Sequence, residues 1–102
     1  MISAYTLDSA TRAHAASPDT FAIPLASERE SLRVGDLAKL MFRFRDGSDE
    51  WVERMWVVVE QVRPETYIGS LDNIPHQAAE PDLGARVEFH SDHVIQINHA
   101  ER

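Results

Sequence analysis

The chain of 102 residues carries 17 acidic and 10 basic side chains, which gives a formal net charge of −7, and it contains no cysteine. Its 43% hydrophobic and 26% charged residues are typical of a folded domain and differ from disordered, collagen-like and membrane chains. The missing cysteines exclude disulfide frameworks, cysteine-based zinc sites, iron–sulfur clusters and thiol nucleophiles. The negative charge disfavours nucleic acid as a partner, because a phosphate backbone is repelled unless the few basic residues gather on one face.

Hydrophobic runs in the sequence are short. The longest uninterrupted one is Met55–Val59, far below the length of a membrane span, and the first residues hold no apolar stretch of signal-peptide length. The sequence therefore predicts a cytoplasmic protein without a membrane partner.

Residues 1–36 are predicted to be helical or irregular. Asp8 or Ser9 is expected to cap an alanine-rich helix that runs to Ala16 and is ended by Pro18. The segment 27–30, Ser-Glu-Arg-Glu, matches a capping box and predicts one or two helical turns that end at Gly35.

A strand-rich region begins at Leu37. The segment 37–45 alternates with period two and places four apolar residues on one face, namely Ala38, Leu40, Phe42 and Phe44. After a turn at 46–50, the segment 51–62 predicts a long strand that would span roughly 40 Å at about 3.3 Å per residue, so we expect it to bend and serve two sheets. Its central run is apolar on both faces, which predicts a buried Trp56 and a more exposed Trp51.

Three shorter strands are predicted next, at 67–71, 86–90 and 94–97, with a loop at 72–82 and a turn at 91–93. Gly69 within the first of them indicates a bulge or a close backbone approach. Together these patterns predict a mainly β fold with short N-terminal helices, a small SH3-like barrel of about five strands, with an open α+β roll as the alternative. The whole is one domain, with an N-terminal segment (1–36), a barrel-like core (37–97) and a tail (98–102).

Signatures of catalysis are scarce. Only four glycines are present and they lie far apart, which excludes a Rossmann fingerprint, a P-loop and a Gly-x-Ser-x-Gly elbow. His76, His90, His93 and His99 lack cysteine neighbours and a spacing that enforces one face, so we expect no metal site, no cofactor and no catalytic residue. The alternative is a small enzyme or ligand-binding protein with a site near His76, His90 and His93. Glu53 and Glu60 do not stand out from a solvated acidic face.

Three short motifs carry a resemblance, namely 55–57 (Met-Trp-Val), 69–75 (Gly-x-Leu-x-Asn-x-Pro) and 83–89 (a Gly turn before an alternating strand). With them, about residues 15–97 of the chain resemble a bacterial family of small domains of unknown function, which is similar to some immunity proteins of toxin systems. The resemblance implies a bacterial cytosolic accessory protein, supplies no catalytic residue, and makes Asn73 and Pro75 the most characteristic loop positions.

These observations favour a non-enzymatic protein-binding module. An acidic turn that leads into an aromatic ring suits a basic protein partner, because charges steer the encounter and the ring supplies buried area. The predicted interaction surface consists of Asp46, Asp49, Glu50, Trp51, Asn73 and Pro75.

Overall fold

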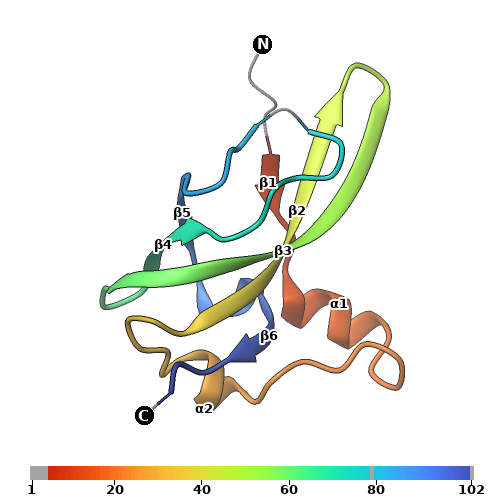
Figure 1. Ribbon diagram of the computed structural model, residues 1–102. Helices are drawn as coiled ribbons and strands as arrows, with labels where there is room; N and C mark the ends of the chain where they lie inside the picture. The colour runs from red at the N-terminus through yellow and green to blue at the C-terminus, as the bar shows by residue number, and fades with distance from the viewer. Residues whose placement is uncertain (1–4, 79, 102) are drawn as a thin grey trace.

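The structure is a computed structural model that describes residues 5–78 and 80–101. Within these ranges the chain is mainly β, as predicted (Figure 1). Its elements in chain order are β1 (Tyr5–Leu7), α1 (Ala10–Ala16), α2 (Ala26–Arg29), β2 (Leu37–Asp46), β3 (Asp49–Val62), β4 (Tyr67–Leu71), β5 (Arg86–Phe89), the 3-10 turn η1 (Ser91–His93) and β6 (Val94–Asn98).

The strands form one antiparallel sheet that curls into a half-barrel. Strands β2, β3, β4 and β5 pair in sequence order, and β6 returns to pair with β2. With a single 3-10 turn before the last strand, this order confirms the predicted SH3-like barrel. A further strand, β1, pairs with residues 42–44 of β2. The sequence did not show it, because three residues are too few to establish a period of two.

The two helices compare differently with their predictions. Helix α1 begins after Ser9, whose hydroxyl accepts the N–H of Arg12, as expected. The capping box predicted at Ser27 is wrong, since α2 starts at Ala26 without a side-chain cap and Ser27 lies inside it. Helix α2 is fixed by its other end instead, where the buried Arg29 guanidinium donates to two backbone carbonyls. Within the described ranges no helix is long and apolar enough to cross a membrane.

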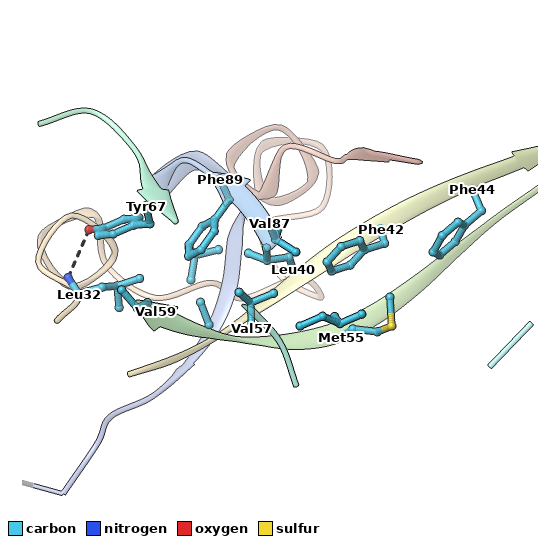
Figure 2. Close-up of a cluster of buried hydrophobic side chains, with 13 residues drawn as sticks. Leu32, Leu40, Phe42, Phe44, Met55, Val57, Val59, Tyr67, Val87 and Phe89 are labelled. Carbon is cyan, nitrogen blue, oxygen red and sulfur yellow. Dashed lines mark hydrogen bonds between the residues drawn. The ribbon is translucent and has the colours of Figure 1, made fainter. Parts of the chain in front are cut away.

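Two buried polar groups attach the segment after α2 and the C-terminal segment to the barrel. The Tyr67 hydroxyl donates to the carbonyl of Arg29 at 2.9 Å. It also accepts the N–H of Leu32 at 3.3 Å (Figure 2). The fully buried Asp36 carboxylate accepts the N–H of Arg33 at 2.8 Å and that of Ala100 at 2.9 Å. Tyr67 thereby holds the segment around the end of α2 against β4, and Asp36 holds the C-terminal segment beside the start of β2.

The core lies on the concave face of the sheet (Figure 2). The predicted inward face of β2 is confirmed, because Ala38, Leu40, Phe42 and Phe44 are all fully buried. On β3 the core residues are Met55, Val57 and Val59.

The prediction that Trp56 lies in the core is wrong, and both tryptophans are half-buried. Trp56 is half-buried on the opposite, outer face of β3, where the Lys39 ammonium lies 5.3 Å from the centre of its ring. Trp51 is the ring on the inner face, and it packs against the core. The outer face of the sheet is itself partly apolar, because α1 packs on it around a second cluster of Ala10, Met41 and Ile95. The apolar run of β3 therefore did not distinguish the two faces.

Strand β3 bends between two neighbours. It pairs with β2 from Asp49 to Val58 and with β4 from Val57 to Val62, with a register shift between Val59 and Gln61. The expected bend is present, but both partners belong to one curled sheet rather than to two sheets. The predicted close approach at Gly69 is confirmed, because a Cβ there would collide with Val57 and with the backbone of β3.

Candidate functional site

The β2–β3 hairpin projects beyond the barrel, at the upper right of Figure 1. Its last strand pair is Asp46 with Asp49, which leaves a two-residue turn of Gly47 and Ser48, and Gly47 adopts a positive φ of 62°. Asp46 and Asp49 are exposed, and within the described part of the chain their carboxylates make no ion pair or hydrogen bond. Both are therefore available to a partner.

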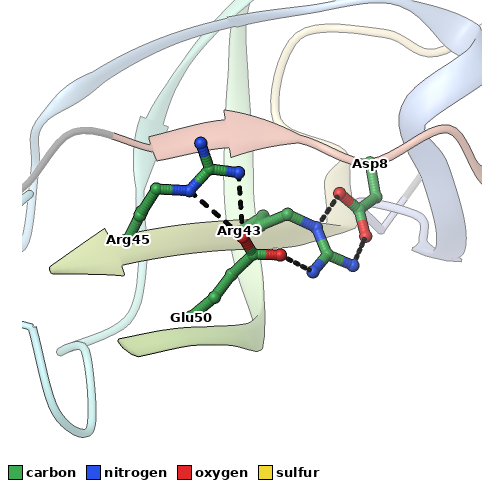
Figure 3. Close-up of polar contacts among 4 residues, drawn as sticks. All are labelled: Asp8, Arg43, Arg45 and Glu50. Atoms are coloured by element: carbon green, nitrogen blue, oxygen red, sulfur yellow. Dashed lines mark hydrogen bonds and ion pairs between the residues drawn. The ribbon is translucent and has the colours of Figure 1, made fainter. Parts of the chain in front are cut away.

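Glu50 is engaged inside the molecule (Figure 3). Its carboxylate accepts hydrogen bonds from Arg43 at 2.7 Å and from Arg45 at 2.8 Å, and Arg43 also binds both oxygens of Asp8. The hydrogen bonds of Arg45 and then of Arg43 lower the pKa of the Glu50 carboxyl. Glu50 thus belongs to a charge-balanced network, and the uncompensated acidic patch is Asp46 with Asp49.

Trp51 is only partly accessible at the site. Its ring is half-buried and stacks on Phe44, with the ring centres 5.5 Å apart. The indole N–H donates to the Glu53 carboxylate at 3.0 Å. These two contacts hold the Trp51 ring in one orientation next to the hairpin tip.

The loop between β4 and β5 carries Asn73 and Pro75 and is tied to β3. The side-chain oxygen of Asn73 accepts the backbone N–H of Trp56 at 2.5 Å, while the N–H of Asp72 donates to the carbonyl of Trp56 at 2.9 Å. Asn73 therefore takes the place of one more strand residue beside β3. Pro75 follows it, half-buried.

Glu53 joins the hairpin to this loop. One carboxylate oxygen accepts the backbone N–H of His76 at 2.5 Å, and the other accepts the N–H of Gln77 at 3.1 Å in addition to the indole of Trp51. Burial acts to raise the pKa of the Glu53 carboxyl, but these hydrogen bonds outweigh it and the pKa lies below its ordinary value. The sequence analysis assigned Glu53 to a solvated acidic face, which is wrong, because the residue is half-buried and its carboxylate accepts three hydrogen bonds. The available signal was a carboxylate in phase with the apolar positions Met55 and Val57.

The three candidate histidines divide between two places. The backbone N–H of His76 bonds Glu53, whereas His90 directly precedes η1 and His93 is the last residue of η1, with the two ring centres 5.5 Å apart. His93 Nδ1 accepts the N–H of His90, so the neutral His93 ring carries its proton on Nε2. Burial, followed by the nearby His90, lowers the pKa of His93. No group of three or more His, Asp or Glu side chains suited to a metal ion occurs among the described residues.

A cleft of about 590 Å³ opens between α1, the β1–β2 pair and η1. His93 lines it together with Asp8, Arg12 and Arg43. Beside it, the Thr11 hydroxyl donates to the Asp92 carboxylate, and this bond lowers the pKa of Asp92. The volume lies within the range of small-molecule sites.

A comparison with known protein families, with curated proteins and with solved structures finds no match for this chain. The resemblance drawn from the short motifs thus stays a prediction.

Proposed function

We propose that this chain is a non-enzymatic protein-binding module of the cytoplasm, of the immunity-like kind that the resemblance implies, and that it engages a basic protein partner. The observation that carries the proposal is the projecting β2–β3 hairpin, which presents the exposed and unpaired carboxylates of Asp46 and Asp49. A formal net charge of −7 adds a long-range field that attracts a basic surface and repels nucleic acid and anionic membranes.

The fixed surroundings of the hairpin support a recognition surface. On one side of the β2–β3 hairpin, Arg43 bonds both Glu50 and Asp8. On the other side, Glu53 bonds the loop that carries Asn73 and Pro75. Because these neighbours of the tip are already ordered, less entropy is lost when a partner binds.

The test is capture of the partner from the native cell with two charge-reversed variants. Reversal of the tip, D46K with D49K, is expected to abolish most partner recovery at moderate salt. The matched control, D19K with E88K, makes the same change in net charge at two other exposed acids and is expected to retain the partner. Both proteins must melt like the wild type. Equal recovery by the two variants would remove the hairpin tip from the interface.

An immunity-like role adds a second expectation. The captured partner is then a toxin, and co-expression of this chain relieves its inhibition of growth, whereas the tip variant does not. A captured protein whose activity the chain leaves unchanged would contradict the immunity role but not protein binding.

A second candidate function is small-molecule binding in the cleft lined by His93. The favouring observation is its volume of about 590 Å³ with Asp8, Arg12 and Arg43 in the wall. A fragment screen by NMR tests it, with shifts confined to α1 and η1 as the expected result and loss of those shifts in H93A. Fragments that shift neither element would exclude this cleft as the site.

A further inference from the structure

Half of β3 has a strand neighbour on one side only. Strand β2 covers it from Asp49 to Val58, but β4 begins to pair at Val57. Among the described residues no other strand pairs with β3. The residues 50–54 thus have a side turned away from β2 without a neighbouring strand, and we call this side the open edge of β3.

Two observations show which backbone groups lie on the open edge. The N–H and carbonyl of Trp56 both point away from β2, because they bond Asn73 and Asp72. In an antiparallel pair this direction alternates with every residue, so the backbone groups of residues 54, 52 and 50 point the same way. The two-residue turn agrees, since it makes Asp46 and Asp49 the pair that exchanges hydrogen bonds and turns the groups of residue 50 outward.

Among the described residues of the neighbouring loop, no backbone group bonds residues 50, 52 or 54 of this edge. After Asn73 the loop turns to the inner face of β3, where His76 and Gln77 bond the Glu53 side chain and Ala78 packs against the core. Arg54 stands on the outer face, with its guanidinium 5.5 Å from the centre of the Phe21 ring. Both neighbours of the open edge are therefore directed to the faces of the sheet.

Free carboxylates lie at both ends of the open edge. Asp46 and Asp49 mark the hairpin end, and Asp72, beside Trp56, marks the barrel end. All three are exposed, and within the described ranges their side chains make no ion pair. An occupant with basic residues at its two ends matches this pattern.

We propose that the open edge of β3 binds an extended basic segment of the partner protein by strand addition, which adds a strand to the sheet beside residues 50–54. This inference rests on the proposed function and specifies how the partner is held. Backbone hydrogen bonds to residues 50, 52 and 54 supply the pairing, and the terminal carboxylates select basic side chains. The open edge is about 17 Å long, which suits a segment of roughly five residues.

A second copy of this chain is a poor occupant. Pairing two such edges would place the carboxylates of one copy against those of the other, because acids mark both ends. Like charges on adjacent strands oppose pairing. The same acids thus protect the open edge from self-association, which is a usual device of natural edge strands.

The probe is a capped peptide of about nine residues with alternating lysine and valine, titrated into the ¹⁵N-labelled full chain. We expect the amide signals of Glu50, Val52 and Arg54 to shift and their hydrogen exchange to slow. The same peptide with N-methyl groups on every second residue should bind about tenfold more weakly, since it loses donors to the open edge. V52P should weaken binding similarly, and V52T, which retains the N–H, should not.

The outcomes separate this inference from the proposed function. If the unmodified and the N-methylated lysine–valine peptides bind equally, or if the signals of Val52 and Arg54 do not respond, the open edge is not the site. Loss of partner recovery in the D46K/D49K variant would in that case still support binding through charge. A glutamate–valine peptide that binds as well as the lysine one would contradict both proposals. A dimer in light scattering, together with slow hydrogen exchange of the Val52 amide, would mean that a second copy of the chain occupies the open edge and would overturn the proposal of a partner segment.

Discussion

Replacement of Glu53 by glutamine tests the connection between the hairpin and the 72–85 loop. The carboxylate uses both oxygens, one for His76 and the other for Gln77 and Trp51. Glutamine keeps one acceptor oxygen and turns a donor toward an N–H group, so one bond is lost and two become uncharged. A hydrogen bond to a charged group contributes about 1.5–3 kcal/mol and a neutral one about 0.5–1.5. Because the site is half-buried, we expect E53Q to lower the free energy of unfolding by about 2 kcal/mol.

The pH dependence gives the same experiment a sharper form. The pKa of Glu53 is lowered in the folded chain, so its stabilisation is complete above the unfolded pKa, near 4.5, and is lost as the pH falls through the lower folded value. Urea unfolding followed by tryptophan fluorescence should therefore separate E53Q from wild type at pH 7, and the gap should narrow as the pH falls below 4.5. E88Q is the matched control, since Glu88 is exposed on β5. Equal stabilities at pH 7, or a gap that does not narrow in acid, would refute the reasoning.

Three further changes test the packing, all by denaturant unfolding. W51A should cost more than W56A, about 3 against 1–2 kcal/mol, because Trp51 packs against the core and Trp56 lies on the outer face; the reverse order would contradict the register of β3. G69A should cost about 1–3 kcal/mol where S70A costs little, because the added Cβ meets backbone atoms of β3; a neutral G69A would mean that the two strands separate easily. Y67F should cost about 1–3 kcal/mol, because it removes a buried hydroxyl that makes two backbone hydrogen bonds; an unchanged midpoint would show that water replaces it.

The sequence predicted the barrel through features that are local. The alternation in 37–45 appears as the buried face of β2, and the isolated Gly69 appears where two strands approach closely. Features that depend on distant partners did not show in the pattern. Strand β1 exists through its pairing with β2, and α2 is placed by the contacts of Arg29 rather than by a cap at Ser27.

The face of β3 shows the limit of periodicity. Residues 55–59 are all hydrophobic, so their phase is ambiguous. The phase is set outside this run, by Trp51 and Glu53, which lie on the same face as Met55. A charged residue such as Glu53 is not expected on the core-facing side of a strand, because burial of an unpaired carboxylate is costly. Glu53 can lie there because the backbone N–H groups of His76 and Gln77 bond its carboxylate.

The same distinction separates the parts of the candidate site. The acidity of the hairpin tip was readable, because a turn exposes its side chains, but the pairing of Glu50 was not, because Asp8 reaches Arg43 only after β1 has joined β2. The open edge had a signal in the lengths of the strands. Strand β3 has 14 residues and β4 has 5, and a short turn joins them, so β4 can reach only the near part of β3. Unless another segment covers the rest, a long strand followed by a short one leaves backbone donors and acceptors for a partner to use.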